Sequence, residues 1–321
     1  MSSDNRVKVS VLVPVYGVEK YIERCARSLF EQTMKDGIEF IFTDDCTRDR
    51  SIEILEKVLE EYPERKSQVK IIHHEKNQGL VSARVTGLKE AVGEYVIHCD
   101  SDDWVEREMY EIMYRQAKDT DSDIVVCDFL EGDDTLEVYR HQNIPESRIS
   151  IFKSILDGTL HAAMWNKMLS HRLIDRLGVK VNPEINMWED MAYMTPHLLS
   201  GCRMTKVDKA LYHYVCVQAS MSRTFSLRSV NSQIKAVDNI SGYVEADPEL
   251  STILSLLKLK SKDYFLLRGE SYNPALWRQT FPEANKEILN ENIPPVKRLL
   301  YYLCEKHLDF AVKLLAGLRK K

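Results

Sequence analysis

The chain has 321 residues, of which 44% are hydrophobic and 29% are charged, and its formal net charge at pH 7 is −5. This length allows one large domain or a main domain with an appendage, and the composition is ordinary for a globular protein. The acidic balance gives no sign of general nucleic-acid binding. The amino terminus lacks a signal sequence, no apolar run reaches membrane-spanning length, and the seven cysteines show no CxxC spacing. We therefore expect a cytoplasmic protein with reduced thiols.

The first 130 residues alternate between short β-rich runs and helical stretches. The expected strands cover residues 9–13, 39–42, 69–72, 95–99 and 123–127. The expected helices cover residues 19–32, 51–62, 82–92 and 106–118. Such alternation predicts an α/β fold with a mostly parallel, Rossmann-like sheet and helices on both faces.

The alternation fades after residue 128. Residues 131–148 are polar and predict a loop, residues 149–200 predict helices around two tryptophan-containing segments, and the chain from about residue 226 onward is helical in pattern. The polar stretch 282–295 ends in paired prolines and is the best candidate for a linker.

Three aspartates follow the fourth expected strand within four positions. They are Asp100, Asp102 and Asp103, in the stretch HCDSDDW. Carboxylates this close repel one another, so a bound cation or an array of donors is expected to offset their charge. The alternative is that Asp102 or Asp103 only caps the helix expected from residue 106.

Other loops would join these aspartates at one edge of the sheet. In an open α/β sheet, ligands bind beyond the carboxyl ends of the strands, where the strand order reverses. A strand order of 3-2-1-4 would gather there Tyr16, the pair Asp44 and Asp45, and the triple aspartate. Unrelated helix caps are not expected to cluster in this way, which favours a binding site.

The chemistry of these loops favours a nucleoside diphosphate held through a divalent metal. Gly17 is the only glycine directly after strand 1, so neither a dinucleotide fingerprint nor a phosphate loop is present. The charge of a diphosphate then needs a metal, and oxygen ligands suit Mg²⁺ or Mn²⁺. The metal would bridge Asp102 and the phosphate oxygens, while Tyr16 could stack on a base and Asp45 could accept its N–H.

Several stretches resemble family 2 glycosyltransferases with the GT-A fold, in particular the branch that builds bacterial surface polysaccharides. Four of these stretches are VSVLVPVYGVEKYIERCARSLFEQT, FTDDCTRDRS, NQGLVSARVTGL and the D-x-D in HCDSDDW. The later segments WNKM, WEDMAY and LYHY…SMS are similar to the same branch. The resemblance covers about residues 7–224, and it implies a GT-A catalytic domain over residues 1–224 and a helical region over 225–321.

The resemblance also implies roles for single residues. The residues implied to bind the nucleotide are Pro14, Tyr16, Glu19, Asp45, Arg84 and Asp100. Asp102 would bind the metal with Asp103 in support, and Asp190 matches the general base, with Glu189 as the second candidate. The sequence departs from the family pattern at Gly17, at Val85, and at residues 46–48, where Cys-Thr-Arg replaces a Gly-Ser-Thr turn.

These roles predict an inverting glycosyltransferase that uses Mn²⁺ or Mg²⁺. It would move a sugar from a nucleotide-diphosphate donor, UDP by family habit, to a hydroxyl of a glycan or lipid-linked acceptor in polysaccharide biosynthesis. One alternative is a sugar-1-phosphate nucleotidyltransferase, which would need a glycine-rich loop with a basic residue after strand 1. Another is a non-catalytic module that binds nucleotide sugars.

Three residues keep two interpretations each. Asp190 could be a base or could only cap the helix that runs to about residue 199. Lys167 could reach a phosphate or the acceptor, or stay solvated. His213 could be a metal ligand, although a hydrogen-bonded structural histidine is the better interpretation.

The carboxyl-terminal residues predict one basic amphipathic helix over 296–321. Apolar positions recur there mainly at spacings of three and four. Seven basic residues stand against two acidic ones, which gives 7 − 2 = +5. Such a helix can lie on an anionic membrane, which would place the protein at the inner face of the membrane. Alternatively, it packs on its own domain or on a second subunit of a homo-oligomer.

Overall fold

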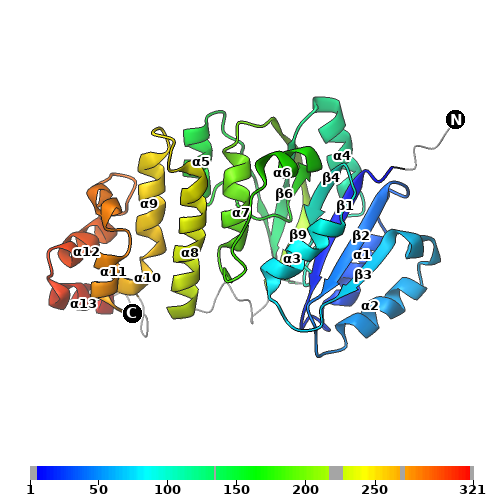
Figure 1. The fold of residues 1–321 in the computed structure, drawn as a ribbon, viewed down its shortest axis with the longest axis horizontal. Coiled ribbons are helices and arrows are strands. Elements are labelled where there is room, and N and C mark those ends of the chain that lie inside the picture. The colour runs from blue at the N-terminus through cyan, green and yellow to red at the C-terminus, as the bar shows by residue number, and fades with distance from the viewer. Residues whose placement is uncertain (1–5, 134, 217–226, 268–271, 319–321) are drawn as a thin grey trace.

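The computed structural model describes residues 6–133, 135–216, 227–267 and 272–318. Within these residues, nine strands form one sheet in the order β3-β2-β1-β4-β8-β6-β9-β5, with β7 paired to β6 (Figure 1). The strands are β1 (Val9–Val15), β2 (Ile38–Asp44), β3 (Val69–His73), β4 (Tyr95–His98), β5 (Trp104–Val105), β6 (Ile124–Gly132), β7 (Glu137–Arg140), β8 (Lys167–Ser170) and β9 (Met204–Val215).

The first four strands are parallel, so the predicted order 3-2-1-4 is confirmed. Alternate side chains of β1 enter different cores, because successive residues of a strand point to opposite faces. Val9, Val11 and Val13 face one hydrophobic cluster, whereas Leu12 faces another. The α/β class with helices on both faces is likewise confirmed.

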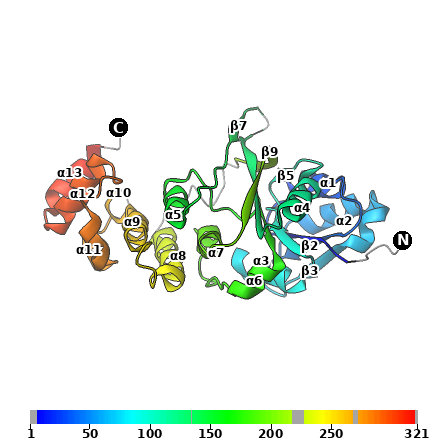
Figure 2. The same ribbon diagram turned by 90° about the horizontal axis from the view of Figure 1, so that it is seen from above.

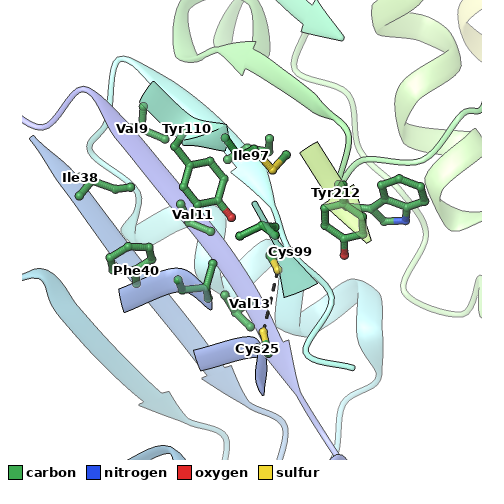
Figure 3. Close-up of a cluster of buried hydrophobic side chains, with 14 of the residues drawn as sticks. Val9, Val11, Val13, Cys25, Ile38, Phe40, Ile97, Cys99, Tyr110 and Tyr212 are labelled. Atoms are coloured by element: carbon green, nitrogen blue, oxygen red, sulfur yellow. Dashed lines mark hydrogen bonds between the residues drawn. The ribbon is translucent and has the colours of Figure 1, made fainter. Parts of the chain in front are cut away.

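One face of this half-sheet carries α1 (Ile22–Phe30), α2 (Ser51–Glu60) and α4 (Met109–Thr120). Figure 3 shows the core beneath them, with Val9, Val11 and Val13 beside Tyr110 of α4. Cys25 of α1 and Cys99, directly after β4, lie there with their sulfur atoms 3.9 Å apart. The other face carries α3 (Leu80–Glu90), which packs on β1 and β2. The 3-10 helix η1 (Pro63–Gln68) leads into β3.

The helix expected from residue 106 begins only at Met109, because β5 intervenes and pairs with β9. Its N-cap residue is Glu108, which makes no side-chain capping bond. Neither Asp102 nor Asp103 therefore caps this helix.

The segment 131–148 is not a simple loop, which corrects the sequence-based expectation. Strand β6 extends to Gly132 and forms a hairpin with β7. All four residues of β7 are exposed, so this strand lacks the apolar alternation from which strands are recognised. Figure 2 shows the hairpin projecting from the body of the molecule.

Helices beyond the sheet extend the molecule in one direction, as both views show (Figures 1 and 2). The helices that share a core with the second face of the sheet are α5 (Arg148–Asp157), α6 (His171–Leu177), α7 (Glu189–Leu198), α8 (Leu227–Val244) and α9 (Ser251–Ser261). The expected domain boundary at 224/225 lies outside the described residues, and the division stays a prediction. Helix α7, from before that boundary, and helix α8, from after it, pack against each other.

A third core lies at the far end of the molecule. It is built mainly from α10 (Tyr264–Leu267), α11 (Pro274–Gln279), the 3-10 helix η4 (Pro282–Glu287), α12 (Pro295–Glu305) and α13 (Asp309–Leu318). The expected linker 282–295 is part of this core, since Ala284, Ile288 and Ile293 are buried. Its polarity reflects exposed side chains between these three positions, so the linker interpretation is wrong.

The single helix expected over 296–321 is two helices in the described residues. The chain turns between α12 and α13 at His307, which adopts a left-handed φ of 58°. Leu300, Tyr301 and Val312 are buried in the third core. No helix in the described parts of the chain combines the length and the apolar character needed to cross a bilayer.

Candidate active site

The loops after β1 and β2 are tied to each other at the carboxyl edge of the sheet. The Gly17 N–H donates to Thr47 Oγ1 (2.9 Å), and the Glu19 N–H donates to Asp49 Oδ2 (3.0 Å). Tyr16, between the end of β1 and Gly17 in the sequence, has 53% of its surface exposed. An exposed ring on a fixed loop is available for stacking on a planar ligand.

Two further contacts shape this edge. The carbonyl oxygen of Pro14 accepts a hydrogen bond from Ser101 Oγ (2.7 Å), which joins the end of β1 to the aspartate loop. Cys46 has a φ of 57°, in the left-handed region that favours glycine. This is the position where the sequence departs from the family's usual glycine, so a cysteine here adopts a conformation that favours glycine.

Asp45 is buried and points into the protein. Its oxygens accept hydrogen bonds from the N–H groups of Gln78 (2.7 Å) and Gly79 (2.8 Å), and Nδ1 of His74 lies 2.8 Å away. Asp45 therefore fixes the turn that starts α3. The role in base contact implied by the resemblance stays a prediction.

Arg84 on α3 joins two distant parts of the chain. Its Nη2 donates to Asp100 Oδ1 (2.9 Å), directly after β4. Its Nη1 donates to Asp190 Oδ1 (2.5 Å) and Glu189 Oε1 (3.2 Å), in the first turn of α7. The arginine is only 6% exposed, so these bonds form away from bulk water. One guanidinium thus brings together four of the residues singled out from the sequence.

The capping interpretation of Asp190 is not supported by this geometry. Helix α7 begins at Glu189, its N-cap is Trp188, and the cap makes no side-chain hydrogen bond. Asp190 lies inside the first turn and uses Oδ1 to bind Arg84. No hydrogen bond to Oδ2 is found among the described residues, and the side chain keeps 22% exposure. One carboxylate oxygen is therefore left for another partner.

Three carboxylates share the single charge of Arg84. Burial opposes the charged guanidinium, but Asp190, Asp100 and Glu189 outweigh that effect and raise the pKa of Arg84. Burial also raises the pKa of the Asp100 carboxyl, against the pull of Arg84. The cluster keeps an excess of negative charge, which favours a cationic partner.

Asp102 and Asp103 have different surroundings. Asp103 is 1% exposed, and its oxygens accept hydrogen bonds from Tyr212 Oη (2.7 Å) and from the Val215 N–H (2.7 Å). Asp102 is half-buried, and within the described residues only its own backbone N–H bonds its carboxylate. Burial and the nearby Asp100 charge raise the pKa of Asp102 to about 6. Asp102 thus lacks the donors that satisfy Asp103.

Lys167 neither reaches the site nor stays solvated, so both interpretations of it were wrong. The side chain is fully buried, and its ammonium donates to the carbonyl oxygens of His161 (2.5 Å) and Ala163 (3.1 Å) and to Asn166 Oδ1 (2.6 Å). These acceptors lie in the turn before β8, which the lysine therefore fixes.

His213 is the hydrogen-bonded structural histidine that the sequence favoured. Its ring nitrogens lie 2.7 Å from Glu137 Oε1 and 3.1 Å from Glu106 Oε1, and its ring stacks on Trp104 at 3.3 Å between centroids. Both nitrogens are thus engaged by carboxylates of neighbouring segments.

Two supporting residues were missed by sequence reasoning. Tyr212 accepts a hydrogen bond from the Asp100 N–H (3.1 Å) and donates to Asp103, so it holds the aspartate loop in place. His74, for which the sequence showed no partner, bonds Asp45 and Thr86. The only signal for Tyr212 was its place in the LYHY segment, where tyrosine is also an ordinary strand residue.

A family model described as Glycosyl transferase family 2 matches residues 10–178, which contain the whole aspartate loop and Arg84. The chain belongs to this family. It is a glycosyltransferase, and the family match decides against a nucleotidyltransferase. The segment with Glu189 and Asp190 lies beyond the matched residues.

Curated relatives of this family 2 glycosyltransferase are 31–32% identical to it over the aligned residues. EpsH, a glycosyltransferase of Bacillus subtilis, is 31% identical over 251 residues, which cover 75% of this chain and 70% of EpsH. EpsJ of the same organism is 32% identical over 213 residues, with 64% and 60% coverage. A cholesterol galactosyltransferase of Borreliella burgdorferi is 31% identical over 238 residues, with 70% and 64% coverage.

Solved structures share its fold at lower identity. TarS residues 1–349 of S. aureus, in complex with UDP-GlcNAc, superposes with a TM-score of 0.75 at 20% identity and covers 98% of this chain and 91% of that one. The mannosyltransferase PcManGT of Pyrobaculum calidifontis, in complex with GDP-Man and Mn²⁺, gives 0.54 at 18% identity, with 98% and 87% coverage. At these identities the likeness concerns the GT-A fold.

The charge of Glu189 predicts a pH-dependent stability of this glycosyltransferase. Burial, and then the neighbouring Asp190, raises the pKa of Glu189 to about 7. The folded protein therefore holds this proton more tightly than the unfolded chain, where the pKa is about 4.3. The resulting stabilisation is complete below that unfolded value and is lost as the pH rises through 7.

We therefore expect the free energy of unfolding to fall from pH 6 to pH 8 by about 1 kcal/mol more in the parent than in Glu189→Gln. Urea denaturation at both pH values measures this difference. The exposed Glu60, replaced by Gln, is the matched control and should follow the parent. The same pH dependence in Glu189→Gln and the parent would contradict the assigned burial effect.

Proposed function

We propose that this glycosyltransferase is inverting and metal-dependent, and that it works in the cytoplasm. It moves a sugar from a UDP-sugar to a hydroxyl of a glycan or of a lipid-linked acceptor in polysaccharide biosynthesis. The observation that carries this proposal is the bridge from Asp100 through Arg84 to Asp190. It joins the loop where a nucleotide is expected to the candidate base, so donor binding and chemistry belong to one site.

The donor pocket in this proposal lies at the carboxyl ends of β1, β2 and β4. Tyr16 stacks on the base, Pro14 and Glu19 line the nucleoside side, and Asp100 lies on the ribose or sugar side. Asp45 acts on the base directly or through the turn at Gln78 and Gly79 that it bonds. UDP is chosen because the structures of TarS were solved with UDP and with UDP-GlcNAc.

Asp102 fits the role of metal ligand, with Asp103 as its support. No cluster of three or more metal-ligating side chains occurs among the described residues. Mg²⁺ and Mn²⁺ sites in nucleotide enzymes commonly use one or two carboxylates and complete their coordination with substrate phosphates and water. A half-buried carboxylate without a donor partner suits that arrangement. When bound, the metal supplies Lewis-acid stabilisation of the leaving diphosphate.

Asp190 is proposed to take the proton from the acceptor hydroxyl. Arg84 holds Oδ1, so Oδ2 can accept the hydroxyl proton while the oxygen attacks the anomeric carbon from the side opposite the diphosphate. Attack from that side inverts the anomeric configuration. The transition state is oxocarbenium-like, as in glycoside hydrolysis. Arg84 meanwhile fixes the direction of the carboxylate.

Replacing Asp102 with Asn tests the metal assignment. The amide keeps the size of the side chain but loses the charge that attracts a cation. We expect the affinity for UDP with Mn²⁺ to fall by about 10- to 100-fold, as for the loss of other groups that support a metal. The melting temperature should stay the same or rise, because carboxylate repulsion is relieved. Isothermal titration with and without Mn²⁺ measures the effect, and Asp36→Asn, exposed before β2, is the control. Unchanged Mn²⁺-dependent binding of UDP would contradict the assignment of Asp102 as a metal ligand.

Replacing Asp190 with Asn separates chemistry from binding. The asparagine oxygen can still accept the bond from Arg84, but the side chain cannot take a proton. Product formation at saturating donor should fall by about 10²- to 10⁴-fold, the usual contribution of a general base. Affinity for UDP with Mn²⁺ should stay within a few-fold, and Asp175→Asn on α6 should behave like the parent. Near-parent turnover would exclude Asp190 as the general base and leave Glu189 as the next candidate. Joint loss of turnover and donor affinity would mean that the residue organises the site.

Membrane contact through α12 and α13 is the second part of the proposal. These helices and the turn between them expose large apolar side chains, namely Val296, Leu299, Tyr302, Leu308, Phe310 and Leu314. Lys306 and Lys313 are exposed among them. An exposed apolar face with basic neighbours suits an anionic bilayer, where a lipid-linked acceptor would be met.

Vesicle binding tests this contact with the full chain, because deleting the helices would remove Leu300 and Tyr301 from a core. We expect the parent to bind vesicles that contain anionic lipid at low salt and to dissociate at high salt. The double variant Phe310→Ser, Leu314→Ser should lose most binding without a change in melting temperature, since both residues are exposed. Val92→Ser, at an exposed apolar residue near the sheet, is the control. Absence of parent binding at low salt would end the membrane proposal.

A further inference from the structure

A cleft of about 650 Å³ lies beside the β6–β7 hairpin, and none of the steps proposed above uses it. Its size falls within the range of about 300–1,000 Å³ found for small-molecule sites. Five of its lining residues carry rings, namely Phe129, Tyr139, His141, His161 and Tyr214. So many flat side chains around one cleft favour a ligand that presents flat apolar faces.

The rings are held at fixed angles to one another. Tyr139 and His141 lie 4.4 Å apart between centroids, and Phe129 meets His161 edge-on at 5.6 Å. Tyr139 is 41% exposed although its hydroxyl donates to Asp128 Oδ2 (3.0 Å), so the ring is both accessible and anchored. An anchored ring loses little conformational entropy when a ligand binds.

The charges that line the cleft are already paired. Arg140 binds Glu131 at 2.7 Å. Asp128, which accepts a hydrogen bond from the Tyr139 hydroxyl but does not itself line the cleft, pairs with Lys206 at 3.0 Å. Nδ1 of the lining residue His141 lies 3.3 Å from the same carboxylate. No cationic group is therefore left over among these residues for a phosphate or a carboxylate of a ligand. An uncharged ligand rich in hydroxyls fits this surface better than an anionic one.

Aromatic stacking connects the cleft to the aspartate loop. Tyr214 lies parallel to Trp165 (5.5 Å, 9°), and Trp165 lies parallel to Tyr212 (4.4 Å, 15°). Tyr212 in turn donates to Asp103. Two buried rings, Trp165 and Tyr212, thus connect the cleft residue Tyr214 to the aspartate loop.

We infer that this cleft is an acceptor subsite that binds a neutral oligosaccharide, namely the sugar units behind the hydroxyl that is attacked. A sugar ring has an apolar C–H face, which packs on an aromatic ring, and hydroxyls at its edge, which bond to polar groups such as the exposed Asn143. The inference rests on the proposed function, since it names the class of acceptor for the same reaction.

A glycan array tests the subsite. The full-length parent, with UDP and Mn²⁺, is applied to an array of neutral and phosphate-bearing bacterial oligosaccharides. The neutral oligosaccharide that binds most strongly is then titrated against four variants. Tyr139→Ala and His141→Ala remove rings, Tyr139→Phe keeps the ring, and Val138→Ala changes an exposed β7 residue that does not line the cleft. UDP affinity with Mn²⁺ is measured for each variant.

We expect binding of a neutral oligosaccharide that weakens by about ten-fold in Tyr139→Ala and in His141→Ala, the size of a lost stacking contact. Tyr139→Phe and Val138→Ala should bind within about three-fold of the parent, and UDP affinity should be equal in all. Binding of phosphate-bearing glycans alone, binding of none, or parent-like binding by both ring-deleted variants would overturn the subsite. If the subsite fails but the parent still binds UDP in a Mn²⁺-dependent way, the proposed donor binding is unaffected. If the parent does not bind UDP with Mn²⁺, that result counts separately against the proposed function.

Discussion

The ion pairs of Arg84 are the constraint on which the rest of the site depends. Three carboxylates from two segments, more than 80 residues apart in sequence, meet one buried guanidinium. Removing one partner of a buried ion pair is costly, because the other charge is left uncompensated. The arginine therefore fixes how α7 approaches the end of β4, and it sets the direction of both Asp100 and Asp190. Its planar fork suits this task, since two nitrogens can serve two sides at once.

The same cluster explains why the mouth of the sheet suits a cationic partner. One positive charge faces Asp100, Glu189 and Asp190, and Asp102 adds a further carboxylate, which only its own backbone N–H bonds within the described residues. Burial raises the pKa values of Asp102 and Glu189, and the neighbouring charges of Asp100 and Asp190 add to this effect. A metal that arrives with a nucleotide diphosphate would relieve this excess. Asp103 accepts a hydrogen bond from Tyr212, and Tyr212 stacks on Trp165. Trp165 in turn stacks on Tyr214, which lines the aromatic cleft.

The sequence predicted the parts of the structure that follow from local pattern. Apolar runs located the first four strands, and the order 3-2-1-4, taken as a condition from the doubly wound α/β class, placed Tyr16, Asp45 and the aspartate loop at one edge. It failed where distant backbone supplies the partners, as with the carbonyl oxygens around buried Lys167. It also failed where no residue type signals the feature. The exposed strand β7 lacks apolar alternation, and the turn at His307 contains neither glycine nor proline.

The most direct measurement of the central claim is turnover by Arg84→Lys at saturating donor. Lysine keeps the charge but offers one nitrogen, which cannot hold Asp100 and Asp190 together. We expect the variant to fold and its turnover to fall by about 100-fold, the cost of small misplacements in an active site. The matched control is Arg65→Lys, a buried arginine that donates to backbone carbonyls and Gln68. It should lose stability but keep the turnover of the folded fraction. Turnover of Arg84→Lys within a few-fold of the parent would contradict the account.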